Sequence, residues 1–231
     1  MEAGWRKKVL GEGLGAFALV VVGAGSVLAA SMAGSDVLLY ATLGHAFVIA
    51  VMATALGPIS GGQITPAVTL GLIATRRIKA DLGVAIIVFQ LIGSIVGGVL
   101  LWWLYPSEVS SGLRLATPAV NSSITPLQAT VVEIVITFFL VFVVFATAID
   151  ARGAGKTLAA FPIGFTVGIG WFFGGALTGA AMSPGRWIGP AVASGFYDNG
   201  WVYWVGPLLG GLIAALVYEY VFKPQAALKS A

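Results

Sequence analysis

Two short stretches of the chain place a hydroxyl residue directly before proline, within sequence that is otherwise apolar. They are Ser60-Gly-Gly-Gln-Ile-Thr-Pro-Ala-Val-Thr-Leu-Gly71 and Thr178-Gly-Ala-Ala-Met-Ser-Pro-Gly-Arg-Trp-Ile-Gly189. In each, the hydroxyl of Thr65 or Ser183 can cap a helix whose first residue is proline. Such a helix end carries partial positive charge, and the capping hydroxyl can still donate a hydrogen bond to a neutral solute. The apolar run after each proline is too short to cross a membrane.

Four ionisable residues, Glu12, His45, Glu133 and Arg186, also lie in apolar surroundings. Ionisable groups inside a membrane usually face a cavity or a partner. Glu12 and Glu133 could form a proton path, as carboxylates inside a membrane often do. His45 and Arg186 could each face such a cavity. Alternatively, His45 could be a polar residue packed between helices, and Arg186 could anchor its helix at the membrane surface.

The sequence offers few groups for covalent chemistry. The chain contains no cysteine and one histidine, which excludes thiolate catalysis and argues against a histidine-based metal site. We find no pairing of a nucleophile with a base, so we expect no enzyme, no metal and no cofactor. The polar residues are therefore expected to form hydrogen bonds and not to break covalent bonds.

The elements that must hold these residues are transmembrane helices. Of the 231 residues, 58% are hydrophobic and 9% are charged, and the mean hydropathy is +0.98, whereas soluble domains carry about 25% charged residues. A spanning helix needs about 20 mainly apolar residues. Six segments qualify: 9–31, 37–57, 82–104, 127–148, 158–177 and 201–222. The predicted fold class is an all-α membrane protein with six transmembrane helices and two half-helices.

The basic residues predict an orientation. All but two of the twelve Lys and Arg residues fall on one side of the predicted spans, and the exceptions are Arg114 and Arg186. The positive-inside rule makes that side cytoplasmic, with both termini there. The basic residues are thus explained by topology, and we expect no nucleic-acid partner. We expect a multi-pass protein, and a prokaryotic plasma membrane as its location. The residues that share this side are Arg6, Lys7, Lys8, Arg76, Arg77, Lys79, Arg152, Lys156, Lys223 and Lys229.

The two halves of the chain repeat the same landmarks in the same order. The matching positions are Glu12 with Glu133, Pro66 with Pro184, and Gly93 with Gly206. We read residues 1–231 as one channel-like domain made of a first repeat, 1–115, and a second repeat, 116–231. Each repeat holds an odd number of spans, so the second must be inverted relative to the first. The half-helices then enter from opposite sides, and their N-termini meet near the membrane centre beside a water-filled path.

With these motifs the chain resembles the aquaporin, or major intrinsic protein, family over nearly its whole length. The two hydroxyl–proline stretches are similar to the family's paired Asn-Pro-Ala loops, and Glu12 and Glu133 match its buried glutamates. The resemblance implies that these glutamates brace the loops by accepting hydrogen bonds from loop N–H groups, in preference to forming a proton path. The resemblance implies a passive channel and a homotetramer with one pore per subunit. It also implies a central pore constriction formed by Thr65, Pro66, Ala67, Ser183, Pro184 and Gly185. The sequence departs from the family pattern at three of these positions, since Thr65, Ser183 and Gly185 replace two asparagines and an alanine.

The resemblance also implies a selectivity filter of four residues, His45, Trp171, Ala180 and Arg186. Helical rise, about 1.5 Å per residue, places three of them at similar depths on the outer side of the membrane centre. Trp171 could alternatively belong to the aromatic belt at the membrane surface. Trp187 stands where water-channel relatives usually carry a small residue, which bears on strict water selectivity.

We expect a channel for water and small neutral solutes such as ammonia that excludes ions and protons, with membrane lipid as its surroundings. Glycerol channels of the family carry an aspartate after the filter arginine and longer insertions around the second half-helix. Here Trp187 follows Arg186 and the link to the sixth span is short, so the resemblance favours water over glycerol. The competing functions are a glycerol or small-polyol facilitator with a widened pore, a secondary transporter, and a non-conducting structural protein. A transporter would need coupling charges, and a non-conducting protein would lack an open path between Thr65 and Ser183.

Overall fold

The computed structural model describes residues 4–153 and 158–223, and in these residues the secondary structure is helical. Six helical segments are long and apolar enough to cross a membrane: Trp5–Met32, Val37–Leu56, Ala80–Leu104, Pro126–Ile149, Ala160–Thr178 and Val202–Phe222. This confirms the predicted all-α membrane fold, and each segment coincides with a predicted span. Lys156 and Lys229, which contributed to the predicted orientation, lie outside the described residues.

Three of the spans contain a wider π-helical turn. The first runs through α1 (Trp5–Ala18), the π-turn η1 (Leu19–Ala24) and α2 (Gly25–Met32). The fourth joins α7 (Pro126–Val144) to η3 (Phe145–Ile149), and the sixth joins α10 (Val202–Val217) to η4 (Tyr218–Phe222). The other spans are α3 (Val37–Leu56), α5 (Ala80–Leu104) and α8 (Ala160–Thr178). The short elements are α4 (Pro66–Ala74), α6 (Ser107–Gly112), the 3-10 turn η2 (Arg114–Ala116) and α9 (Pro184–Ser194).

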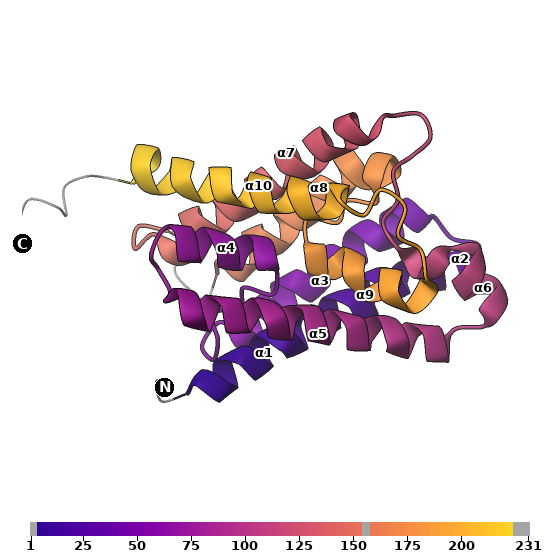
Figure 1. Cartoon of the computed structure of the whole chain (residues 1–231), viewed down its shortest axis with the longest axis horizontal. Helices are drawn as coiled ribbons and strands as arrows, with labels where there is room; N and C mark the ends of the chain where they lie inside the picture. Colours follow the sequence, from indigo (N-terminus) through magenta and orange to yellow (C-terminus); the bar gives the residue numbers. More distant parts are fainter. Residues whose placement is uncertain (1–3, 154–157, 224–231) are drawn as a thin grey trace, which may run out of the picture.

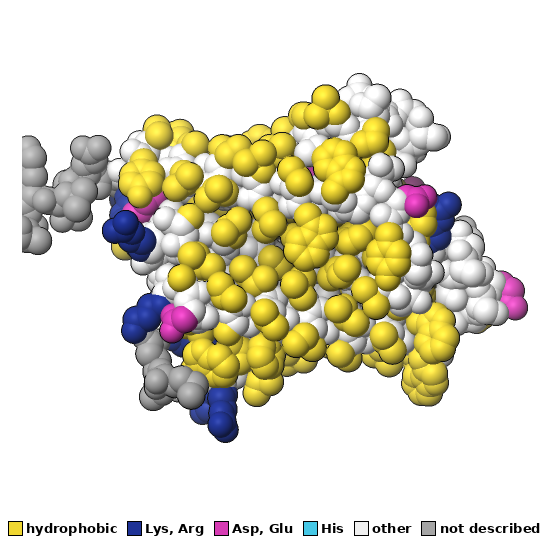
Figure 2. Space-filling view, viewed as in Figure 1, with side chains coloured by type: hydrophobic (Ala, Val, Ile, Leu, Met, Phe, Trp, Pro, Cys, Tyr) yellow, Lys and Arg dark blue, Asp and Glu magenta, His cyan; other side chains and the backbone are white. Residues whose placement is uncertain are grey.

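The outer faces of the spans carry apolar side chains, as a lipid-facing surface requires. Along α8, the exposed residues Phe161, Phe165, Ile169 and Phe172 recur at helical spacing on one side of the helix. The opposite side is buried and includes Trp171. Figure 2 shows apolar side chains spread over the flank of the bundle. The buried side of α8 is therefore the one that can reach a path through the protein.

The two half-helices, α4 and α9, occupy opposite halves of the long axis of the bundle (Figure 1). Each begins at the predicted proline, behind a hydroxyl cap: Thr65 Oγ1 accepts from Val68 N at 3.3 Å, and Ser183 Oγ accepts from Gly185 N at 3.1 Å. A Cβ built on Gly185 would lie 3.8 Å from Cδ of Pro66, so the two N-termini abut. This arrangement is the inverted pair of half-helices predicted from the sequence, whereas the repeat boundary at 115/116 stays a prediction.

Glycines let the two repeats pack across each other. A Cβ on Gly98 of α5 would collide with the carbonyl of Gly189 in α9. A Cβ on Gly211 of α10 would lie 2.9 Å from the carbonyl oxygen of Ala67 in α4. The third span of the first repeat therefore contacts the half-helix of the second, and the sixth span contacts the half-helix of the first. Such close backbone approach between small residues stabilises helix contacts in membranes.

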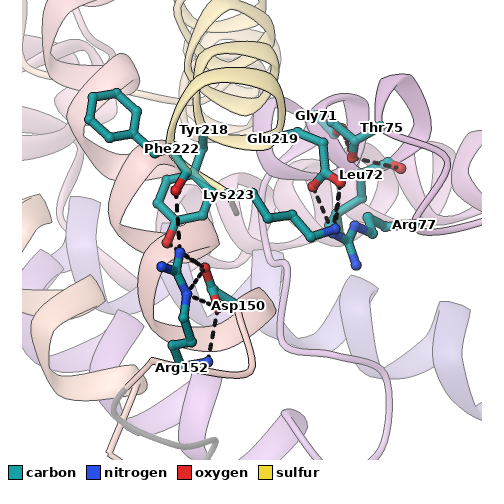
Figure 3. A network of polar contacts seen from close by, with 10 residues as sticks. All are labelled: Gly71, Leu72, Thr75, Arg77, Asp150, Arg152, Tyr218, Glu219, Phe222 and Lys223. Carbon is teal, nitrogen blue, oxygen red and sulfur yellow. Dashed lines mark hydrogen bonds and ion pairs between the residues drawn. The ribbon is translucent and has the colours of Figure 1, made fainter. Parts of the chain in front are cut away.

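One end of the bundle, here called the basic end, holds both ends of the described chain and most of its charges (Figures 1 and 2). Its described basic residues are Arg6, Lys7, Lys8, Arg76, Arg77, Lys79, Arg152 and Lys223, and its acidic residues are Asp81, Asp150 and Glu219. Figure 3 shows the polar contacts there. Arg77, which follows α4, pairs with Glu219 of η4 at 2.6 Å, and Lys223 reaches Glu219 at 2.7 Å.

Candidate functional site

The first loop, residues 60–65, is held by the carboxylate of Glu12 in α1. Glu12 is fully buried and accepts from Ser60 Oγ at 2.6 Å, from Gln63 N at 3.0 Å and from Ile64 N at 2.5 Å. Gln90 of α5 adds a bond from its Nε2 at 3.1 Å. A loop inside a membrane has no water to satisfy its N–H groups, so a buried carboxylate meets that need.

The second loop, residues 178–183, is held in the same way by Glu133 of α7. The buried carboxylate accepts from Thr178 Oγ1 at 2.7 Å, from Ala181 N at 2.9 Å and from Met182 N at 2.8 Å. The donors match those of the first loop position by position. Both carboxylate oxygens of each glutamate accept from loop or side-chain donors, which supports a bracing role over a proton path.

The backbone of both loops takes the same unusual shape. Ile64 has φ of 62° and Met182 has φ of 50°, in the left-handed region that bulky residues rarely adopt. Both residues donate their N–H to the bracing glutamate. The hydrogen bond therefore holds each residue in a conformation that it would not adopt unaided. This geometry turns the chain sharply before each half-helix begins.

The four predicted filter residues lie together beyond the start of α9, and we call them the arginine cluster: His45, Trp171, Ala180 and Arg186. Arg186 is 1% exposed, and its Nε donates to Nε2 of His45 at 2.8 Å. The rings of His45 and Trp171 lie with their centroids 4.4 Å apart. Ala180 is buried and lines the same small cavity as His45.

The hydrogen bonds of His45 determine its protonation state. Nδ1 lies 2.7 Å from the carbonyl oxygen of Ala41, which can only accept, so Nδ1 carries the proton. Nε2 receives the Nε–H of Arg186, so it carries none. His45 is therefore a neutral imidazole that orients the guanidinium. The charge of the cluster comes from Arg186 alone.

Two buried donors of the cluster have no hydrogen-bond partner within the described part of the chain. They are Nη1 of Arg186 and Nε1 of Trp171. The other guanidinium nitrogens are used, because Nη2 of Arg186 donates to the carbonyl of Ala116 at 3.0 Å. Buried donors normally find a partner, so these two N–H groups are suited to a water molecule or a solute oxygen.

A narrow cavity leads from the cluster toward the membrane centre. Its volume is about 10 Å³, close to the minimum that one water molecule needs. Its lining is mostly apolar, with His45 and Thr65 as the polar side chains: Leu19, His45, Ile49, Thr65, Leu140, Val167, Ala180, Ala181 and Met182. The cavity therefore connects the arginine cluster with the hydroxyl at the start of α4.

The predicted constriction residues lie where the half-helices abut. Gly185 is placed against α5, where an added Cβ would lie 2.7 Å from Oγ of Ser94. The glycine in place of alanine is therefore matched to Ser94. Trp187 packs in an apolar cluster, with its ring stacked on Tyr203 at a centroid distance of 6.0 Å. It contacts α10, so it does not belong to the arginine cluster.

Sequence reasoning missed three partners of the site: Gln90, the carbonyl of Ala116, and Gly23. A Cβ on Gly23 would lie 2.5 Å from Nε2 of His45, so only glycine leaves room for the ring. Gln90 carried a signal, because a glutamine inside an apolar span is expected to have a polar partner. Within the described residues, His, Asp and Glu side chains do not gather in a group of three that could hold a metal.

Six apolar spans, two abutting half-helices and a polar cluster beside a narrow cavity are the features of a membrane channel. A family model described as major intrinsic protein matches residues 2–218. The chain belongs to the major intrinsic protein family, whose members are channels.

Relatives with known names agree with this assignment. The chain is 39% identical over 233 residues to aquaporin-4 of Mus musculus, covering 99% of this chain and 71% of that protein. It is 41% identical over 235 residues to aquaporin TIP4-3 of Zea mays, covering 97% and 90%. Matches to aquaporin-4 of other mammals cover 55% of those proteins.

Among solved structures, the aquaglyceroporin from Plasmodium falciparum superposes with a TM-score of 0.86, covering 97% of this chain and 99% of that one. At 23% sequence identity, that likeness shows the fold alone.

Proposed function

We propose that this protein is a passive channel for water and for small neutral solutes such as ammonia, and that it excludes ions and protons. The observation that carries the proposal is the pair of buried, unpartnered donors, Nη1 of Arg186 and Nε1 of Trp171, in the arginine cluster. Two other members of the cluster, His45 and Ala180, line a cavity of about 10 Å³. A water molecule fits the volume and accepts hydrogen bonds from such donors. His45, Trp171, Ala180 and Arg186 then act as the selectivity filter.

Cations are excluded by charge. Arg186 is positive and His45 is neutral, so a cation entering the cluster meets one fixed positive charge and no compensating carboxylate among the four filter residues. Further along the path, the N-termini of α4 and α9 add two partial positive charges. Water carries no net charge and loses little when it exchanges its neighbours for these donors.

Protons are excluded by the orientation of water at the centre. Thr65 Oγ1 and Ser183 Oγ each accept a backbone N–H as a helix cap, so their O–H hydrogens are free to donate. A water oxygen that accepts from both hydroxyls cannot also accept a proton from the next water. These residues, with Pro66, Ala67, Pro184 and Gly185, form the proposed central constriction.

The size of the cluster favours water over glycerol. The stacked rings of His45 and Trp171 fill one side of it, and Arg186 is tied to both His45 and Ala116. Ala180 is the one small side chain among the four. A glycerol facilitator would need the indole to move aside.

A secondary transporter and a non-conducting structural protein fit the geometry less well. A transporter needs charges that couple to substrate, whereas Glu12 and Glu133 are occupied by loop donors. A structural protein would have no use for unpartnered donors in the arginine cluster. We further propose that the basic end faces the cytoplasm, by the positive-inside rule, that the subunits form a homotetramer, and that the source is a prokaryotic plasma membrane.

The proposal is tested by osmotic shrinkage of proteoliposomes in stopped-flow light scattering, with glycerol uptake followed in the same vesicles. Wild type should pass water well above protein-free liposomes and glycerol no faster than they do. Trp171→Ala should raise the rate of glycerol uptake about tenfold or more, because the indole no longer fills the cluster. Phe172→Ala, which changes an exposed neighbour on α8, is the matched control and should behave as wild type. Water rates equal to those of protein-free liposomes would overturn the proposal.

A further inference from the structure

A cavity of about 530 Å³ opens at the basic end, between the first turns of α1, the C-terminal end of α4 and the start of α5. Four basic residues line it: Lys8, Arg76, Arg77 and Lys79. The residues proposed for the filter and for the central constriction are not among those that line it. The cavity is therefore separate from the residues that we assign to conduction.

We propose that this cavity binds the phosphate headgroup of an anionic phospholipid. Among the described residues that line it, four are basic and none is acidic. The nearby Glu219 accepts from Nη2 of Arg77 at 2.9 and 2.6 Å. Figure 3 shows Glu219 between Arg77 and Lys223, so its charge is shared by two cations. Clusters of Lys and Arg at the end of a membrane protein attract lipid phosphates.

The backbone contributes a second attraction for phosphate. Lys79 is the N-cap residue of α5, and its side chain makes no capping hydrogen bond. The first N–H groups of this 25-residue helix therefore have no side-chain acceptor at the N-cap. The start of a long helix carries the positive end of the helix dipole, which attracts phosphate, and Asp81 in the first turn offsets part of that charge. Ala80 and Leu82, in this first turn, line the cavity.

The surroundings indicate a lipid as the source of the phosphate. Ile73, Ile78 and Leu82 give the cavity an apolar wall. Beyond it, α1 and α5 expose Leu10, Leu14, Val84 and Val88 toward the membrane, with 47–61% of each side chain accessible. An acyl chain can lie along these residues while its headgroup occupies the cavity. A free phosphate ion would use the basic residues and leave the apolar surface bare.

The test is a lipid titration of the purified full-length protein in detergent, read by native mass spectrometry. The probes are phosphatidylglycerol and phosphatidylcholine with identical acyl chains, and inorganic phosphate as the free ion. Wild type should bind at least one phosphatidylglycerol selectively over phosphatidylcholine, and phosphate should not compete at equal concentration. The double variant Arg76→Gln/Lys79→Gln should weaken phosphatidylglycerol binding about tenfold or more.

The matched control is Arg6→Gln/Lys7→Gln, which removes the same charge from the basic end without touching the cavity lining. It should retain selective binding. Equal losses in both double variants would show unspecific attraction to the basic end and would overturn the site. Phosphate that displaces the lipid at equal concentration would overturn the lipid as ligand. Because binding is read without transport, either result leaves the proposed water conduction untouched.

Discussion

The loops before the two half-helices are braced alike and lined differently. In both, a buried glutamate accepts hydrogen bonds from one side-chain hydroxyl and from two consecutive backbone N–H groups. Glu12 accepts from residues 60–64, and Glu133 accepts from residues 178–182. In both, the second of these N–H donors is a bulky residue with positive φ. The shared part is therefore what keeps an irregular loop folded inside a membrane.

The lining residues differ where solutes would pass. Arg186 has Val68 as its counterpart in the first half, and it alone brings a charge and a partner on another span, His45. One residue further along, Thr69 hydrogen-bonds to Gln90 at 3.1 Å, whereas its counterpart Trp187 stacks on Tyr203. The difference teaches that folding constrains both halves equally, while selectivity rests on the second half.

Removing a brace should have the largest effect, and a similar one in either half. Glu133→Ala deletes three hydrogen bonds to a buried carboxylate, each worth about 1.5–3 kcal/mol, and leaves two N–H groups unsatisfied. Glu12→Ala should be comparable. We expect both variants to unfold at markedly lower temperature in detergent, and Glu108→Ala, on the exposed helix α6, to match wild type. A neutral result for one glutamate would break the equivalence of the loops.

Replacing Arg186 by the residue of the first half should separate folding from selectivity. Arg186→Val removes the one charge of the arginine cluster and keeps the cap and the brace. We expect water permeability to persist and cation or proton leakage to rise about tenfold or more, since the electrostatic barrier is lost. A pH-sensitive dye inside proteoliposomes reports the leak. Unchanged proton flux would mean that the half-helix ends alone exclude charge.

Disrupting the hydrogen-bonded pair of Thr69 and Gln90 in the first half should have a smaller effect on stability and permeability. Thr69→Val removes the hydroxyl that Gln90 contacts, at a cost of about 1–2 kcal/mol, because Gln90 keeps its bond to Glu12. Water permeability should stay at the wild-type level. The unfolding midpoint in detergent measures the first effect and stopped-flow light scattering the second. A large loss of permeability would assign the first half a part in selectivity.

The smallest effect concerns the loop that follows η3 in the second half. A hydrogen bond from the Arg152 side chain holds the pKa of Asp150 below its usual value. A carboxylate with a lowered pKa in the folded state stabilises the protein above its unfolded pKa, near 3.9, and loses that contribution as the pH falls further. We therefore expect Asp150→Asn to change the unfolding midpoint slightly between pH 5 and 8, with the difference from wild type vanishing only in strong acid. A difference that vanishes near neutral pH would contradict the lowered pKa.

The spans could be predicted from the sequence because long apolar runs with few charges rarely form anything other than membrane-spanning helices. The starts of the half-helices could be predicted because a hydroxyl residue before proline is a strong local signal. His45, Trp171 and Arg186 could be brought together by depth along their helices. The carbonyl of Ala116 could not, because it comes from a turn in which Arg114, Leu115 and Ala116 all have positive φ. Every residue has a backbone carbonyl, so the residue type does not show which one accepts a hydrogen bond. The cramped positions of Gly23 and Gly185 likewise depend on which helix lies opposite.

The most direct test of the central claim is to measure water and proton flux in the same wild-type proteoliposomes. A vesicle that contains a pH-sensitive dye reports both, by light scattering after an osmotic step and by fluorescence after a pH step. We expect water efflux well above that of protein-free vesicles, with proton flux equal to theirs. Water efflux at the protein-free rate, or proton flux that rises together with water, would contradict a water path closed to charge by Arg186 and the two half-helix ends.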